Sequence, residues 1–209
     1  MPARRVLCLL PLLLATPLAQ AGLPVKVLDV RGDDFPFLIH ETGLPPPLDD
    51  NGLPRAPGCE SVRARRVDEL PSPWSEAVDR VHMDCQPVPA PSDDGDMLAI
   101  TAIAFLKPGH VRMAGHPVAE IRMMDSEFWG DHQYVIAERY EQAAADLRAL
   151  VETACTQRSL RSERQDAPPC RMEEGEGGLY MDSSEIGGIW IHADPDDPAM
   201  TVFAEAWAD

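Results

Sequence analysis

The first 21 residues constrain the rest of the chain most, because they have the pattern of an export signal and so take no part in a folded domain. A basic pair at positions 4–5 is followed by an apolar run over 6–18, and residues 19–21 are Ala-Gln-Ala. This order is typical of a secretory signal peptide, and the apolar run is too short to span a bilayer. We therefore expect cleavage after Ala21 and a periplasmic chain without a membrane anchor.

Export decides how the cysteines are interpreted. One cysteine lies within the signal, and four follow it: Cys59, Cys85, Cys155 and Cys170. In an oxidising compartment an even number of cysteines indicates disulfides, and four cysteines allow three pairings. We favour Cys59–Cys85 with Cys155–Cys170, because each of these pairs brackets one local unit of the chain.

The mature chain is strongly acidic. Removal of residues 1–21 leaves 188 of the 209 residues and takes away two arginines, so the formal charge changes from −17 to −19. Such a surface repels nucleic acid and anionic lipid, and it attracts basic partners or cations. The simpler alternative is that the acidity serves only to keep the protein in solution.

Periodicity predicts a chain of short strands with one long helix. Residues 98–106 are apolar at both alternating sets of positions, which is typical of a central strand covered on both sides. The stretch from 135 to 156 has helical spacing of its apolar residues. Ser72 and Pro73 are suited to begin a shorter helix that continues to Cys85. Further strands are expected at 25–30, 35–40, 110–113, 118–123, 178–182, 188–194 and 201–207.

These elements predict an α+β fold. We expect antiparallel β meanders with the long helix packed on one sheet face, and two disulfides that staple the fold. Residues 22–209 are treated as a single exported domain. Within it, the proline-rich stretch over 43–58 is expected to be an extended connector, and 87–96 a linker-like loop.

The sequence shows no catalytic constellation. The Gly-x-Ser-x-Gly elbow of hydrolases is absent, and the His-Glu pair at 40–41 lacks the second histidine of a zinc protease. A thiol nucleophile is disfavoured in an oxidising compartment. We therefore expect no catalytic residues and no cofactor, and an enzyme with an unrecognised site is the third of three hypotheses.

Metal binding is also weakly indicated. His110, His116 and His132 would come together if the predicted meander forms, but their spacing is mixed. Two aspartate-rich stretches, 93–96 and 194–197, do not have the spacing of an EF-hand loop. Aspartate is common in turns for local hydrogen bonding, so we assign no metal ligand.

Aromatic residues near the C-terminus are the candidate binding residues. In the predicted C-terminal meander one face carries Tyr180, Trp190, His192, Phe203, Glu205 and Trp207, and the other face forms the bed for the helix. Phe128 and Trp129 form a further pair. Exposed rings among acidic groups are typical of a protein-binding surface. The alternative is that other segments cover these rings and make them core.

Compartment, charge and the missing catalytic set favour a binding protein. In general character the chain resembles small periplasmic inhibitors and immunity proteins, which neutralise enzymes that attack the cell envelope. The resemblance implies a basic protein partner, because an acidic binder gains association rate from opposite charge. The alternative is an envelope accessory or small-ligand-binding protein.

Overall fold

The apolar segment at 98–106 lies inside an antiparallel sheet. The structure, a computed structural model, describes residues 23–24, 36–41, 51–52, 58–89, 96–126, 129–161, 170–183 and 187–208. In it, the segment belongs to strand β5 (Asp96–Leu106), which pairs with β4 (Val78–Pro89) on one side and with β7 (His116–Asp125) on the other. The even-numbered residues of β5 from 100 to 106 are buried on one face, whereas Ile103 and Phe105 are half-buried on the other.

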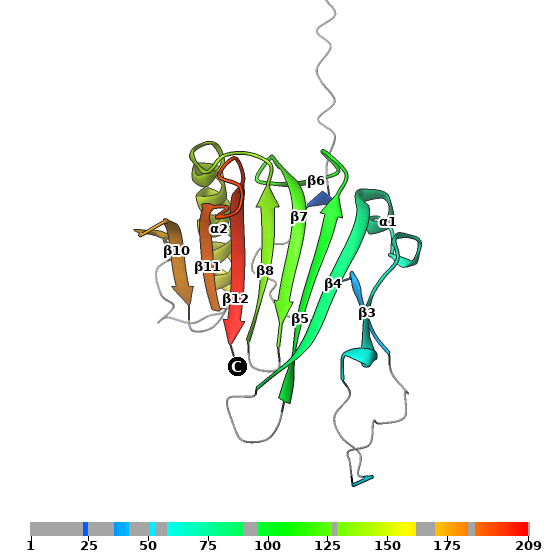
Figure 1. Cartoon of the computed structure of the whole chain (residues 1–209). Coiled ribbons are helices and arrows are strands. Elements are labelled where there is room, and N and C mark those ends of the chain that lie inside the picture. Colours follow the sequence, from blue (N-terminus) through cyan, green and yellow to red (C-terminus); the bar gives the residue numbers. More distant parts are fainter. Residues whose placement is uncertain are drawn as a thin grey trace, which may run out of the picture.

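From β7 the sheet continues through five more antiparallel strands (Figure 1). In spatial order they are β8 (Trp129–Ile136), β12 (Thr201–Ala208), β11 (Gly187–Ala193), β10 (Gly178–Ser183) and β9 (Glu173–Gly175). The short β6 (Val111–Met113) pairs with the start of β7, and β1 (Leu23–Pro24) lies parallel to β6.

Helix α2 (Tyr140–Arg161) lies behind β11 and β12 in Figure 1 and covers one side of the sheet, which we call the helix face. Ala143, Leu147 and Val151 are four residues apart and are fully buried in the same cluster as Ile191 and Phe203. This spacing places one apolar stripe of the helix against the sheet. The opposite side of the sheet is called the open face.

The N-terminal part of the chain covers the helix face at the other end of the sheet. Its elements are β2 (Leu38–His40), η2 (Cys59–Ser61), β3 (Val62–Ala64), η3 (Val67–Glu69) and α1 (Trp74–Ala77). Leu38 and Val62, from the paired β2 and β3, pack against Ile100 and Met123 of the sheet. Phe37 stacks edge-on with Trp74 at 5.1 Å between ring centroids.

The predicted disulfide pairing is confirmed. Cys59–Cys85 joins η2 to β4 and closes a 26-residue separation. Cys155–Cys170 joins α2 to the segment before β9 and closes a 15-residue separation. The α+β class, with mostly antiparallel sheet, one long packed helix and two disulfides, is also confirmed. Among the described residues no helix is both long and apolar enough to cross a membrane.

The helix predicted from Pro73 to Cys85 is wrong over most of its length. Helix α1 ends at Ala77, and Val78 begins a 12-residue strand. The register shifts between Val78 and Arg80, so a bulge brings Val78 and Val81 to the same face of the sheet. This three-residue spacing imitates a helical stripe. The loop predicted over 87–96 is also wrong at its start, because residues 87–89 belong to β4. In the described sheet β4 pairs with β5 alone, and an outer strand of this kind can contain prolines.

The long helix begins later than predicted. Val135 and Ile136 are the buried end of β8, a strand that the periodicity did not reveal, and α2 starts at Tyr140. The polar residues of β8 hid its alternation, since Asp131, His132 and Gln133 interrupt the apolar pattern. The strand predicted over 25–30 and most of the connector over 43–58 lie outside the described residues.

The face assignment of the last strand is wrong by one residue. Phe203 lies opposite Ile191 and Tyr134, so Phe203, Glu205 and Trp207 belong to the helix face. Ala204 lies opposite Trp190 and belongs to the open face. A shift of one position exchanges the two faces of a strand, and two apolar sets of equal length left the sequence ambiguous.

Candidate functional site

The open face of β10 and β11 carries one exposed and one half-buried aromatic residue side by side. Tyr180 and Trp190 lie directly opposite each other on neighbouring strands, and the next pair along is Gly178 and His192. Trp190 is 41% exposed and is the single large hydrophobic residue that is exposed among the described residues. A tryptophan in this position has one ring surface available for contact with a partner.

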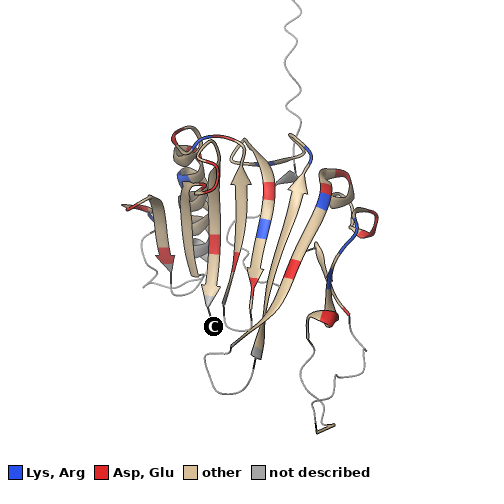
Figure 2. Ribbon diagram, in the orientation of Figure 1, with Lys and Arg blue, Asp and Glu red and all other residues tan. Residues whose placement is uncertain are grey.

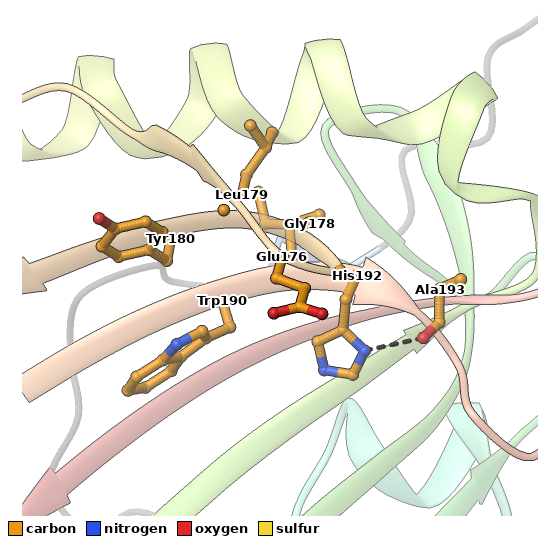
Figure 3. A pocket seen from close by; sticks show the side chains of 10 residues that line it. Glu176, Gly178, Leu179, Tyr180, Trp190, His192 and Ala193 are labelled. Carbon is orange, nitrogen blue, oxygen red and sulfur yellow. Dashed lines mark hydrogen bonds between the residues drawn. The ribbon is translucent and has the colours of Figure 1, made fainter.

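These residues line a shallow hollow of roughly 410 Å³ at the β9–β10 end of the sheet (Figure 3). Leu179 points away from the hollow toward α2, whereas the rings of Trp190 and His192 lie on the open side. The lining residues are Gly175, Glu176, Gly177, Gly178, Leu179, Tyr180, Trp190, Ile191, His192 and Ala193.

Glycines shape the hollow. A Cβ at Gly188 would overlap the Trp190 ring, and a Cβ at Gly175 would lie 3.1 Å from the Tyr180 ring. The rings of Trp190 and Tyr180 therefore lie close against the backbone of the sheet, at glycines that carry no side chain. Gly177, with φ of +95°, forms the tight turn between β9 and β10. This turn holds Glu176 at the rim.

The electrostatic character of the hollow is acidic. Glu176 lies between the Trp190 and His192 side chains in the view of Figure 3. The hydroxyl of Tyr180 donates to Glu173 Oε2 at 2.8 Å, and this hydrogen bond raises the pKa of Tyr180. Acidic residues lie at the β9–β10 hairpin and at the far end of β10 (Figure 2). None of the ten lining residues is Lys or Arg.

His192 adds an imidazole ring to the hollow wall. The Ala193 carbonyl oxygen lies 2.8 Å from Nδ1, and a carbonyl can only accept, so Nδ1 carries the proton. In the neutral ring this leaves Nε2 as an acceptor. The hollow thus offers aromatic surface, a carboxylate and an imidazole acceptor, which together suit a cationic group.

The other predicted binding residues are placed differently. Phe203 is fully buried on the helix face, where its ring centroid lies 6.0 Å from that of Tyr134. Trp207 is half-buried and contacts the ring of His132 edge-on at 5.1 Å. Trp129 begins β8, its side chain lying outside the description, and Phe128 lies outside the described residues. Of the six predicted residues, the structure therefore brings Tyr180 and Trp190 together at the hollow.

Two polar side chains are buried together on the helix face, which the sequence pattern did not indicate. Glu205 and His132 lie directly opposite each other on β12 and β8 and are 1% and 7% exposed. Burial lowers the pKa of His132 to about 4, so the ring is neutral at pH 7. Burial, reinforced by the nearby Glu205, raises the pKa of Tyr134. With so little exposed surface these side chains belong to the interior of the protein.

The histidines that were considered together as metal ligands, His110, His116 and His132, have different surroundings in the structure. The Nδ1 atom of His116 is 2.6 Å from Glu138 and its Nε2 atom is 3.2 Å from Asp146, so this ring ties β7 to α2. His110 is exposed in the turn before β6. In the described parts of the chain no three potential ligands are grouped as for a metal ion.

Asp194, the first residue of the aspartate stretch at 194–197, is held by hydrogen bonds within the protein. Asp194 is 1% exposed, and its Oδ2 atom accepts from Arg122 at 3.1 Å on the open face. Its Oδ1 atom accepts from the backbone of Asp196 at 2.9 Å. These bonds fold the β11–β12 connection onto the sheet.

Comparison with protein-family models, with curated proteins and with solved structures found no match, so the geometry of the chain itself carries the functional argument.

Proposed function

We propose that this chain is an exported acidic binding protein of the inhibitor or immunity type, which captures a basic protein in the periplasm and blocks it. The proposal is supported by the signal pattern of residues 1–21, by two disulfides and by the charge of −19 that remains after cleavage. Capture would neutralise an enzyme that attacks the envelope.

One observation carries the proposal. Trp190 is exposed beside Tyr180 and Glu176, on the sheet face that α2 leaves open. Tryptophan and tyrosine are enriched at the centres of protein interfaces, where they contribute most of the binding energy. The acidic rim adds orientation and a faster encounter with a basic surface.

The test is affinity capture with the mature chain and with a Trp190→Ala variant as separate baits. Periplasmic extracts of the producing cell and of competing bacteria provide the prey. We expect one basic protein in stoichiometric amount with the wild-type bait, and loss of most of it with Trp190→Ala. Capture should weaken as salt rises from about 0.05 to 0.5 M, because screening shortens the range of the charge attraction.

The matched control is Glu174→Gln, which removes one charge from the other face of the same hairpin. Glu174 lies beside Leu179 in the sheet register and pairs with Arg148 at 3.5 Å. This control should capture as much partner as the wild type. The absence of any stoichiometric partner from either extract, or a partner retained in full by Trp190→Ala, would contradict the proposal.

The hollow itself favours a second candidate, small-ligand binding. Its volume of roughly 410 Å³ falls within the range of ligand sites. A screen of small cationic and neutral compounds by thermal shift tests this candidate. A rise in the unfolding temperature of the wild type that Trp190→Ala abolishes, without any protein partner in the capture experiment, would favour it.

A further inference from the structure

We infer that the β9–β11 hollow is an arginine-binding site, in which a partner's guanidinium group stacks on Trp190 and pairs with Glu176. This inference rests on the proposed function, since the arginine would belong to the captured protein. It adds the chemistry of the contact and the residues that make it.

The open face already contains one such contact, made within the chain. The guanidinium carbon of Arg80 lies 3.8 Å from the centroid of the Phe105 ring, on the far part of the same face. Trp190 is the larger ring, and tryptophan is the best of the aromatic residues for this interaction. In the described chain no Lys or Arg lines the hollow around it. An external cation can therefore lie over the Trp190 ring in the way that Arg80 lies over the Phe105 ring.

The hollow also provides hydrogen-bond acceptors where a guanidinium edge would lie. Glu176 projects from the turn on the open side of the sheet, and Nε2 of His192, an acceptor in the neutral ring, is on the same side (Figure 3). Glu173 is already held by the Tyr180 hydroxyl, which leaves Glu176 as the charge partner within the lining. A guanidinium has a flat face for stacking and several N–H groups along its edge, whereas an ammonium has no flat face.

The position of the Trp190 ring depends on Gly188. Because a Cβ at this position would overlap the ring, Gly188→Ala displaces the ring while the indole itself remains. The atoms in conflict are the far end of a side chain, so the backbone of β11 is expected to stay in place. This variant separates the position of the tryptophan from its presence.

The experiment is a titration of the mature protein with three blocked peptides, acetyl-Gly-Xaa-Xaa-Gly-amide, in which Xaa is arginine, lysine or citrulline. Binding is followed through the indole N–H signal of Trp190 in NMR spectra, assigned with Trp190→Phe. We expect the arginine peptide to bind at least about twofold more tightly than the lysine peptide. The uncharged citrulline peptide should bind weakest.

Variants locate the binding. Trp190→Ala should weaken the arginine peptide about five- to thirtyfold, which corresponds to the loss of a partly desolvated cation–π contact. Glu176→Gln should weaken it about two- to fivefold at low salt, as for an exposed ion pair. Glu174→Gln should leave the affinity unchanged, and Gly188→Ala should weaken it while the denaturation curve shows a folded protein.

Two outcomes would overturn the inference. One is an arginine peptide that binds no more tightly than the citrulline peptide, which would make the hollow a platform for neutral ligands. The other is an affinity that none of the three hollow variants changes. Failure of the proposed function is distinguishable, because it appears in the capture experiment as a missing partner even when the arginine peptide binds.

Discussion

The two faces of the β10–β12 part of the sheet are built from the same strands and differ in what covers them. On the helix face, Ile191 and Phe203 are fully buried in the core that α2 completes. On the open face Trp190, which directly precedes Ile191 in the sequence, is 41% exposed. Alternation along each strand supplies aromatic side chains to both faces, and the helix then decides which of them are core. Aromatic content alone therefore does not identify a binding surface.

The largest effect that tests this comparison is the loss of Phe203. Phe203→Ala should lower the free energy of unfolding by about 3–5 kcal/mol, because it removes a fully buried ring and leaves a cavity. Trp190→Ala, the same kind of truncation on the open face, should cost less than about 1 kcal/mol. Urea denaturation of both variants measures the difference. Equal losses would show that the open face is covered as well.

The second effect concerns the link between α2 and the hairpin that bears the hollow. Replacing both Cys155 and Cys170 by serine should cost about 3 kcal/mol, since the bridge closes a 15-residue loop. The measurement is urea denaturation without reductant, with the Cys59–Cys85 bridge intact in both proteins. A double variant as stable as the wild type would mean that packing of α2 alone holds this edge.

The third effect is a pH dependence of the folding stability, which arises from His132 on the helix face. The pKa of His132 falls from 6.5 to about 4 on folding, so below pH 6.5 the unfolded chain binds a proton that the folded chain does not. Stability should therefore be highest above pH 6.5 and should fall by up to about 3 kcal/mol as the pH falls to 4. His132→Gln should flatten this slope. Equal slopes in both proteins between pH 6.5 and 4 would contradict the assignment.

Much of the fold follows from local patterns in the sequence. The strand at 98–106 and the three C-terminal strands were predicted within about two residues, because alternation and turn residues act locally. The disulfide pairing followed from cysteine spacing within local units. Errors arose where a non-local feature changed the pattern. The bulge beside Val78 produced a false helical stripe, and the polar residues of β8 hid a central strand.

The candidate site was predicted in part. Tyr180 and Trp190 were identified as aromatic residues that share a face, and the structure places them opposite each other. Glu176 was not identified, because nothing in its local sequence shows that the turn brings it to the same hollow as Trp190. A Trp that lies two residues after a strand glycine, as Trp190 follows Gly188, is a signal that could have indicated a ring lying flat on the sheet.

By itself, the sequence determined the strongly acidic charge, and it favoured the fold class and the cysteine pairing that the structure shows, since each depends on composition or on contacts near in sequence. The tertiary structure alone decided which aromatic residues are exposed. Exposure depends on the register of β12 against β11 and on the position of α2, and both are set by contacts between segments far apart in the chain. Phe203 and Trp190 have similar local surroundings, and the packing of one helix makes the first core and leaves the second open.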